Sequence, residues 1–263
     1  MTLRVFFGAD PRRWPKYAGP VREALAEIGI DAEVTDAAPD PAAVDYIITS
    51  PGGVILDYRP FSRAKAVLNL FAGVENLLSN PTLVQPLCRM VDPAMTQSMA
   101  EWVTGHVLRH HLGMDAHVLG QDGVWRNQIA PPLAAERPVG ILGLGELGQA
   151  AGQMLAGVGF PVTGWSRRPK SVPGIASLSG GQGLVEVLGG SDIIVLLLPL
   201  TKDTENLLDA GRLALMPAGA VIVNAARGGL IDDAALLAAL DSGRIGHATL
   251  DAFRTEPLPP EHP

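Results

Sequence analysis

The chain has 263 residues, of which 47% are hydrophobic and 18% are charged, a composition typical of globular domains. Its net charge of −7 argues against a nucleic-acid surface, which needs a basic face, although a few arginines can still bind a small anion. The single cysteine, Cys88, cannot form an internal disulfide, and no apolar run approaches the roughly 18 residues of a membrane span. We therefore expect a soluble, cytoplasmic protein with neither a membrane nor a nucleic-acid partner.

The first third of the chain alternates short apolar runs with amphipathic stretches, which predicts a parallel sheet covered by helices. Near Asp92-Pro93 this pattern gives way to one long helix, expected from about Ala94 to Leu119. We place the domain boundary there, with a first domain over 1–93 and a second over 94–263. The strands predicted for the first domain are Leu3–Phe7, Val44–Thr49 and Ala66–Leu70, and its helix covers Val21–Ile28.

A second βα series follows a proline-rich stretch, and its continuous apolar runs are typical of strands buried on both faces. We interpret the glycine-rich segment Gly180–Gly190 as a loop with a short helix around Leu184–Leu188. The predicted fold class is α/β, with two Rossmann-like or flavodoxin-like parallel-sheet domains joined at a hinge and a doubly wound second domain. Its predicted strands are Val139–Leu142, Val162–Trp165, Ile193–Leu198, Ala220–Val223 and Ala248–Leu250, with helices over Gln149–Val158 and Asp233–Leu240.

A glycine motif of the dinucleotide-binding type lies between the first of these strands and the following helix. In such a motif the first glycine makes a tight turn, the second lets backbone approach a pyrophosphate, and the third lets helix and strand pack closely. The helix N-terminus supplies N–H groups and partial positive charge. A tight turn without a ligand is the alternative interpretation. The residues predicted to bind the cofactor here are Gly143, Gly145, Glu146, Leu147 and Gly148.

The end of the next strand bears on which dinucleotide binds. NAD sites place a carboxylate about 20 residues after the glycine loop, where it accepts hydrogen bonds from the ribose. Here the chain has Ser166, Arg167 and Arg168, which would attract a 2′-phosphate. Hydrogen bonds to charged groups contribute roughly 1.5–3 kcal/mol each, so two of them would favour NADP(H) over NAD(H) by on the order of 100-fold. The alternative is a pair of solvated surface arginines.

Two later segments place charged residues just beyond predicted strands, where an open α/β sheet binds its ligands. Arg227 follows one strand and is succeeded by two glycines, which would let it turn into a cleft. Asp251 ends another strand and Glu256 lies in the loop after it. Each of these residues taken singly is typical of a protein surface, but their joint position at one rim points to catalysis.

These segments resemble a known family. The runs NAARGGLID and LDAFRTEPLP resemble the two signature segments of the D-isomer-specific 2-hydroxyacid dehydrogenases. LNLFAGVENLL resembles the substrate loop of that family, MAEWVTGHVL its long inter-domain helix, and LLLPLTKDTENLL the segment beside the adenosine. GWSRRPKSVPG and EPLPPEHP are most similar to the glyoxylate/hydroxypyruvate reductase A branch.

The resemblance implies a role for each matching residue. Arg227 would hold the substrate carboxylate and polarise the adjacent carbonyl, while Glu256 would hydrogen-bond a protonated catalytic histidine. Asp251 would meet the nicotinamide carboxamide. Phe71 stands where the family usually has Gly, and Glu75 where it has Asp. The remaining matches are the backbone N–H groups of Ala72, Gly73 and Val74, which would grip the carboxylate, and Leu198, Pro199, Thr204 and Ala225, which would line the cofactor.

The proton donor of the family is a histidine roughly twenty residues beyond the position of Glu256. His262 lies too close to Glu256 and matches a non-catalytic histidine, and His247 precedes a strand at its amino end. We interpret the histidines of the long helix region as helix-surface or interface residues. The expectation is therefore a native chain that continues beyond Pro263 and supplies the histidine, a last strand and a C-terminal helix. The helix-region histidines are His106, His110, His111 and His117.

Three functions remain open at this point. The first is NADPH-dependent reduction of glyoxylate or hydroxypyruvate to glycolate or D-glycerate. The second is an NAD-dependent dehydrogenase for lactate-like or phosphoglycerate-like D-2-hydroxy acids, and the third is a non-catalytic dinucleotide-binding module. The resemblance also implies a homodimer built from the long helix and the arm at about 120–130, and we expect no metal site.

Overall fold

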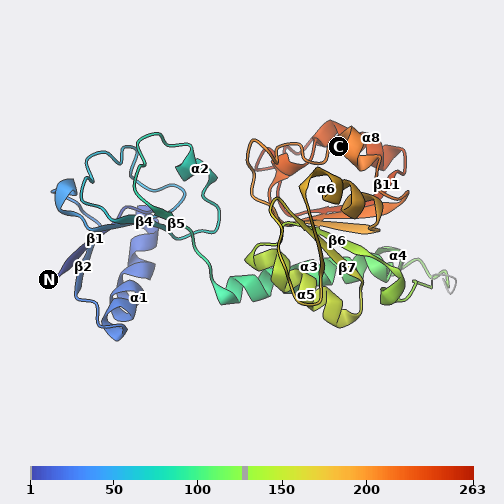
Figure 1. The fold of residues 1–263 in the computed structure, drawn as a ribbon, viewed down its shortest axis with the longest axis horizontal. Helices are drawn as coiled ribbons and strands as arrows, with labels where there is room; N and C mark the ends of the chain where they lie inside the picture. The colour runs from blue at the N-terminus through green and yellow to red at the C-terminus, as the bar shows by residue number, and fades with distance from the viewer. Residues whose placement is uncertain (1, 126–129) are drawn as a thin grey trace. The chain divides into compact units, whose positions relative to one another are not determined.

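The computed structural model describes residues 2–125 and 130–263, and part of the predicted dimer arm, 126–129, lies outside them. The chain divides into two compact units, Met1–Val91 and Asp92–Pro263, here called unit 1 and unit 2. Each unit contains one parallel β-sheet with helices packed against it (Figure 1). The predicted α/β class with two parallel-sheet domains is thereby confirmed.

Unit 1 has a five-stranded sheet of order β2-β1-β3-β4-β5, the flavodoxin-like order. Two of these strands were not predicted, because β2 contains only four residues, one of them buried, and β5 only two, neither of them buried. The strands are β1 (Leu3–Phe7), β2 (Ala32–Thr35), β3 (Tyr46–Thr49), β4 (Ala66–Asn69) and β5 (Leu87–Cys88), and the helices are η1 (Pro11–Arg13), α1 (Trp14–Glu27), η2 (Pro41–Ala43) and α2 (Glu75–Leu78).

Helix α1 covers one face of this sheet, as Figure 1 shows. Val5 and Phe7 of β1 pack on the side of the sheet that α1 covers. Phe6, between them, points to the opposite face and packs with Tyr58 and Phe61. The prediction that this helix starts at Val21 was wrong, because it begins seven residues earlier and contains Pro20. The sequence-based boundary failed because prolines usually interrupt helices, while here the packing of the apolar face on the sheet compensates.

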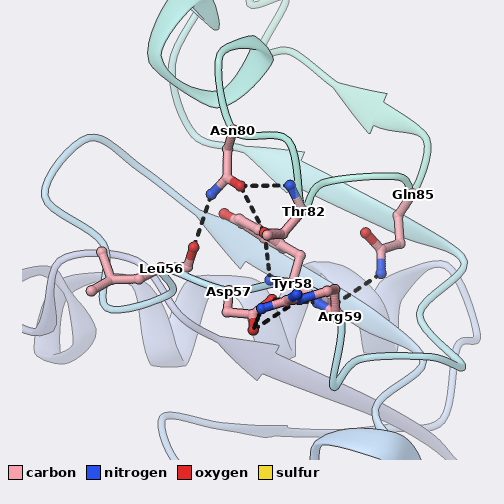
Figure 2. A network of polar contacts seen from close by, with 7 residues as sticks. All are labelled: Leu56, Asp57, Tyr58, Arg59, Asn80, Thr82 and Gln85. Atoms are coloured by element: carbon pink, nitrogen blue, oxygen red, sulfur yellow. Dashed lines mark hydrogen bonds and ion pairs between the residues drawn. The ribbon is translucent and has the colours of Figure 1, made fainter.

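The face opposite α1 is covered by long loops that side chains tie together (Figure 2). Asn80 donates to the carbonyl of Leu56 and accepts from Thr82, whose hydroxyl in turn accepts from the backbone N–H of Tyr58. Gln85 donates to the carbonyls of Tyr58 and Phe61. These bonds replace the ladder that a helix or strand would provide, so the loops keep a defined path without regular structure.

Unit 2 has a six-stranded sheet of order β11-β10-β9-β6-β7-β8, which is the doubly wound order 3-2-1-4-5-6 with all six positions filled. Whether a further strand exists stays a prediction. The strands are β6 (Val139–Leu142), β7 (Val162–Ser166), β8 (Ala176–Ser179), β9 (Ile193–Leu196), β10 (Ala220–Asn224) and β11 (Ile245–Leu250). The helices are α3 (Pro93–His111), α4 (Met114–Val118), η3 (Ala134–Glu136), α5 (Glu146–Val158), α6 (Gly180–Gly189), α7 (Ala210–Leu213), η4 (Gly228–Leu230) and α8 (Asp233–Asp241).

The central strands of unit 2 are buried on both faces. Helices α3 and α5 pack on one face, and α6 and α8 pack on the other (Figure 1). Along β9, Ile193 and Val195 pack in the core beneath α3 and α5. Ile194 and Leu196 pack in the core beneath α6 and α8. Continuous apolar runs were therefore reliable signs of these strands, because both side-chain directions meet a helix layer.

Two predictions in unit 2 were wrong. The single helix expected over Ala94–Leu119 is broken, because Gly113 adopts a left-handed conformation with φ of 61° between α3 and α4. The segment Gly180–Gly190, interpreted as mostly loop, is the helix α6, and the strand β8 precedes it. Glycine has a low intrinsic helix propensity, but the buried Leu184, Val187 and Leu188 hold this segment on the sheet.

Candidate active site

All six strands of unit 2 are parallel, so their carboxyl ends form one rim. The loops after β6, β7, β9, β10 and β11 start there, and every site residue predicted in this part of the chain lies in one of them or at their junctions. The structure thus brings together five segments that are far apart in sequence. This is the edge at which doubly wound sheets bind their ligands.

The three glycines of the loop after β6 differ in how much space the fold leaves for a Cβ atom. Gly143 has φ of 112°, and a Cβ there would lie 2.6 Å from the carbonyl oxygen of Leu197. A Cβ at Gly148 would lie 1.8 Å from the carbonyl oxygen of Gly143. At Gly145, by contrast, a Cβ would meet no atom within 4 Å. The fold therefore requires the first and third glycines, whereas the second leaves open space beside the N-terminus of α5, which Glu146 and Leu147 begin.

The turn after β7 presents three cations. The buried Ser166 donates from its hydroxyl to the carbonyl oxygen of Arg168 at 2.7 Å, so this hydroxyl closes the turn. Arg167 lies 3.6 Å from the carboxylate of Asp203 in a solvent-exposed pair, and the Arg168 guanidinium has no acceptor among the residues described. Lys170, which the sequence analysis missed, donates to the carbonyl oxygen of Leu144 and so lies against the glycine loop. Its only sequence signal is its position two residues after Arg168.

The loop after β9 runs beside the glycine loop. The backbone of Leu197 and Leu198 closes on Gly143, as the short approach to that glycine shows. Thr204 donates to the carbonyl oxygen of Pro199 at 2.7 Å and accepts from the N–H of Thr201 at 2.8 Å. The predicted residues Leu198, Pro199 and Thr204 therefore belong to one closed turn that lies beside the glycine loop.

A buried amide positions the loop that carries Arg227. Asn224, the last residue of β10, is 0% exposed; it accepts from the N–H of Ala226 at 3.1 Å and donates to the carbonyl oxygen of Arg227 at 2.9 Å. Arg227 itself donates to the carbonyl oxygen of Ala226 at 2.8 Å. Ala225, the residue before Ala226, is buried against the sheet. Asn224 was missed as a site residue, although an amide that ends an apolar strand is a usable signal for a polar anchor.

The Arg227 loop and the loop after β11 touch at the level of their backbones. A Cβ at Gly228 would lie 2.0 Å from the carbonyl carbon of Phe253, so only glycine permits this approach. Asp251 donates its N–H to the carbonyl oxygen of Asn224 at 2.9 Å. Glu256 is exposed and accepts from the N–H of Phe253 at 2.9 Å, which closes the turn between them. The two predicted signature segments are therefore one structural unit.

Arg254, another residue that the sequence analysis missed, fastens the loop after β11 to its surroundings. Its guanidinium donates to the carbonyl oxygen of Ile231 at 2.9 Å and to the side chain of Asn206. It also pairs with Glu205 at 3.5 Å and Asp233 at 3.4 Å. These partners give Arg254 a structural role.

In unit 1, the loop after β4 carries the residues predicted to grip a carboxylate. The buried Asn69, the last residue of β4, donates to the carbonyl oxygens of Phe71 and Gly73, both at 2.8 Å. The N–H groups of Ala72, Gly73 and Val74 meet no acceptor among the residues that the structure describes. The loop therefore turns its carbonyls inward and keeps N–H groups available for an anion, an arrangement known from anion-binding nests.

The histidines of the helix region have packing partners. His106 packs on Trp102 with ring centroids 4.2 Å apart, and His111 is buried edge-on against Phe160. His110 hydrogen-bonds the hydroxyl of Thr249 at 2.8 Å. Burial, together with the charges of His247 and Arg109, lowers the pKa of His110 to about 4. The pKa values of His106 and His111 are also lowered, mainly by burial.

The described part of the chain shows neither a membrane-spanning helix nor a cluster of metal-binding side chains. Over residues 2–125 and 130–263, no helix is long and apolar enough to cross a membrane. In the same part of the chain, no group of three or more histidine, cysteine or acidic side chains is arranged to hold a metal ion.

Comparison with known proteins decides the family. Residues 103–263 match the family described as D-isomer specific 2-hydroxyacid dehydrogenase, NAD binding domain. The chain belongs to the D-isomer-specific 2-hydroxyacid dehydrogenases. A relative in Serratia proteamaculans, glyoxylate/hydroxypyruvate reductase A, is 37% identical over 233 residues, which cover 85% of this chain and 74% of the relative.

Solved structures of the family superpose on the whole chain. One is a D-isomer specific 2-hydroxyacid dehydrogenase from Xanthobacter autotrophicus Py2 in complex with NADPH and MES; it has a TM-score of 0.90 and 39% identity over 100% of this chain and 84% of that one. Another is an NADPH-dependent glyoxylate/hydroxypyruvate reductase from Sinorhizobium meliloti in complex with NADP and sulfate, with a TM-score of 0.81 and 35% identity over 99% and 84% of the two chains.

The glycine loop yields a stability prediction. We expect Gly148→Ala to lower the free energy of unfolding by about 1–3 kcal/mol or more, because its Cβ would meet a backbone oxygen that cannot move independently. Gly145→Ala, the matched control, is expected to change it by less than about 0.5 kcal/mol, because its Cβ enters open space. Urea unfolding of both variants measures this, and equal destabilisation would contradict it.

His110 yields a pH prediction. Its pKa of about 4 in the folded protein lies below the usual 6.5, so the unfolded chain takes up a proton first as the pH falls. The free energy of unfolding should therefore decrease between about pH 6.5 and pH 4. His110→Gln is expected to remove on the order of 1–2 kcal/mol of that decrease, whereas His117→Gln, on the exposed surface of α4, should remove none. Unfolding curves at pH 7 and pH 4.5 test this; identical slopes for all three proteins would refute it.

Proposed function

We propose that this chain carries the cofactor site and the substrate-binding arginine of an NADPH-dependent reductase. Its substrates are small 2-keto acids, with glyoxylate reduced to glycolate and hydroxypyruvate to D-glycerate. The observation that carries the proposal is the rim of unit 2. There the glycine loop leaves open space at Gly145, and the buried Asn224 positions the Arg227 loop at the same rim. Relatives named as reductases of these two acids support the choice of substrate.

The residues present fit a bound NADP(H). The space at Gly145, beside the N-terminus of α5, would receive the pyrophosphate, with Gly143 and Gly148 shaping the turn. Arg167, Arg168 and Lys170 would surround the 2′-phosphate as cations, and Ser166 would hold their turn closed. The remaining contacts would come from Glu146, Leu147, Leu198, Pro199, Thr204, Ala225 and Asp251.

The proposed chemistry assigns a role to residues of each unit taken by itself. When bound, the nicotinamide would supply the hydride that reduces the carbonyl carbon of the keto acid. Arg227 holds the substrate carboxylate and polarises the carbonyl oxygen, where negative charge develops. In unit 1, the N–H groups of Ala72, Gly73 and Val74 are proposed to bind a substrate carboxylate. Glu256, exposed at the rim, hydrogen-bonds the histidine that protonates the new hydroxyl, a residue that we do not assign within unit 1 or unit 2.

We also propose that the protein is a cytoplasmic homodimer that uses α4 and the segment after it. Several large apolar side chains are exposed there, among them Leu119 at 82% and Trp125 at 86%. Several exposed apolar side chains of this size in one stretch of sequence are typical of an interface. The molar mass in solution, measured with and without Trp125→Ser, tests the dimer.

The proposed reaction predicts the effect of one substitution. The intact protein should oxidise NADPH in the presence of glyoxylate or hydroxypyruvate. Arg227→Lys should lower kcat/KM for both acids by at least about 100-fold, because a lysine cannot form the two parallel hydrogen bonds of a guanidinium, while the Kd for NADPH stays unchanged. Arg212→Lys, on the exposed side of α7, is the matched control and should retain activity. Tight NADPH binding without reduction of either acid would favour a non-catalytic dinucleotide-binding module.

The cofactor preference gives a second prediction. Arg167→Gln combined with Arg168→Gln should raise KM for NADPH by about 10- to 100-fold and leave KM for NADH within about twofold, because only the former carries the 2′-phosphate. Steady-state kinetics with both cofactors measure this, with Arg212→Gln combined with Arg244→Gln as the charge-matched control. A wild-type protein that uses NADH as well as NADPH would instead support the NAD-dependent alternative.

A further inference from the structure

Arg13 is an arginine of unit 1 that the proposed mechanism does not use. It ends η1, just after β1, and its guanidinium carbon lies 4.8 Å from the ring centroid of Phe71. Phe71 begins the loop that offers the N–H groups of 72–74, and its carbonyl is fixed by Asn69. Because β1 and β4 are both parallel to β3, Arg13 and this loop lie at the same rim of the unit 1 sheet.

Among the described residues the Arg13 guanidinium forms no ion pair, although its charge helps to lower the pKa of Asp10. Its Nε is completely buried without a hydrogen-bond partner, and its guanidinium forms no hydrogen bond or ion pair with any residue within the described ranges. The nearest carboxylate, Asp10, is occupied by Arg12, whose Nε and Nη2 contact its two oxygens at 3.1 and 2.7 Å. Hydrogen bonding from Arg12 lowers the pKa of Asp10 to about 2, so that pair stays ionised.

An unpaired guanidinium with a buried donor is unusual, because buried polar groups nearly always have partners and lose free energy without them. The face of Phe71 compensates the charge in part and fixes the plane of the guanidinium. The Nη groups of that plane, unlike the buried Nε, remain for a ligand. A planar fork of N–H donors recognises a carboxylate in particular.

We propose that Arg13 is a specificity-determining residue of the substrate site, where it binds a second carboxylate of the ligand. The 72–74 loop would hold the first carboxylate, and Arg13, stacked on the preceding residue, would hold the other. The site would then accept four-carbon dicarboxylic 2-keto and 2-hydroxy acids in addition to the small acids above. This inference rests on the proposed function, since it places the substrate carboxylate at the 72–74 loop.

Ligand binding tests the inference without requiring turnover. D-Malate carries the second carboxylate and D-lactate does not, so both are titrated calorimetrically into the NADP⁺-saturated protein. Wild-type protein should bind D-malate at least about 10-fold more tightly. Arg13→Gln should weaken D-malate by about 10- to 100-fold and D-lactate by less than threefold, since one charge-assisted bond pair is lost. Arg13→Lys, which keeps the charge, should fall between the two.

Two matched variants separate this role from others. Arg59→Gln removes an equal charge from an exposed pair with Asp57 in the same unit (Figure 2) and should leave both affinities unchanged. Phe71→Leu leaves the arginine but removes its ring support, and should weaken D-malate by about 3- to 10-fold. Equal weakening of both acids by Arg13→Gln would overturn the inference, as would D-malate binding no tighter than D-lactate in the wild type.

The proposed function is tested independently of this inference. NADPH oxidation with glyoxylate and hydroxypyruvate is measured on the same preparations. If neither is reduced but Arg13→Gln still discriminates the two ligands, the reductase proposal fails and the second carboxylate site stands. If both are reduced but the variant shows no discrimination between D-malate and D-lactate, the second site fails and the reductase proposal stands.

Discussion

Backbone-to-backbone contact at the sheet rim is the constraint on which the site of unit 2 depends. Gly143 closes on the backbone of Leu197, Gly148 on Gly143, and Gly228 on Phe253, each at a distance that no Cβ permits. The first contact joins the loops after β6 and β9, and the third joins the loops after β10 and β11. Because backbone positions are fixed by the strands below them, these loops need little further stabilisation.

Both units use the same device to shape a binding loop. An asparagine ends a central strand and is buried, Asn69 after β4 and Asn224 after β10, and each donates to carbonyl oxygens of the loop that follows. In each case the side-chain amide donates hydrogen bonds to loop carbonyl oxygens that would otherwise be buried without partners. As a result the loop of unit 1 keeps free N–H groups and the loop of unit 2 presents an arginine, which are two complementary ways to bind a carboxylate.

The chain is acidic overall, with a net charge of −7, yet its proposed ligands are anions. Some of its surface cations are paired locally, as Arg12 is with Asp10 and Arg254 with Glu205 and Asp233. Arg13 and Arg168 form no ion pair with a described residue, and both lie at a rim of a sheet. Affinity for an anion depends on a few unpaired cations at short range, because solvent and salt screen the net charge at a distance.

Local patterns in the sequence were enough to predict the strands whose apolar runs meet helices on both faces, and with them the doubly wound class. The position of a residue after a strand was enough to predict the loops that carry Gly143, Arg227 and Glu256. The sequence patterns missed β2, β5 and β8, which are short or half-exposed strands, and misjudged α6, where packing overrides the low helix propensity of glycine. No sequence pattern indicated that Gly145 faces open space while Gly148 does not, or that Arg13 stacks on Phe71. Such differences depend on neighbours far away in the sequence, and the identity of a residue does not reveal which of its atoms the fold leaves free.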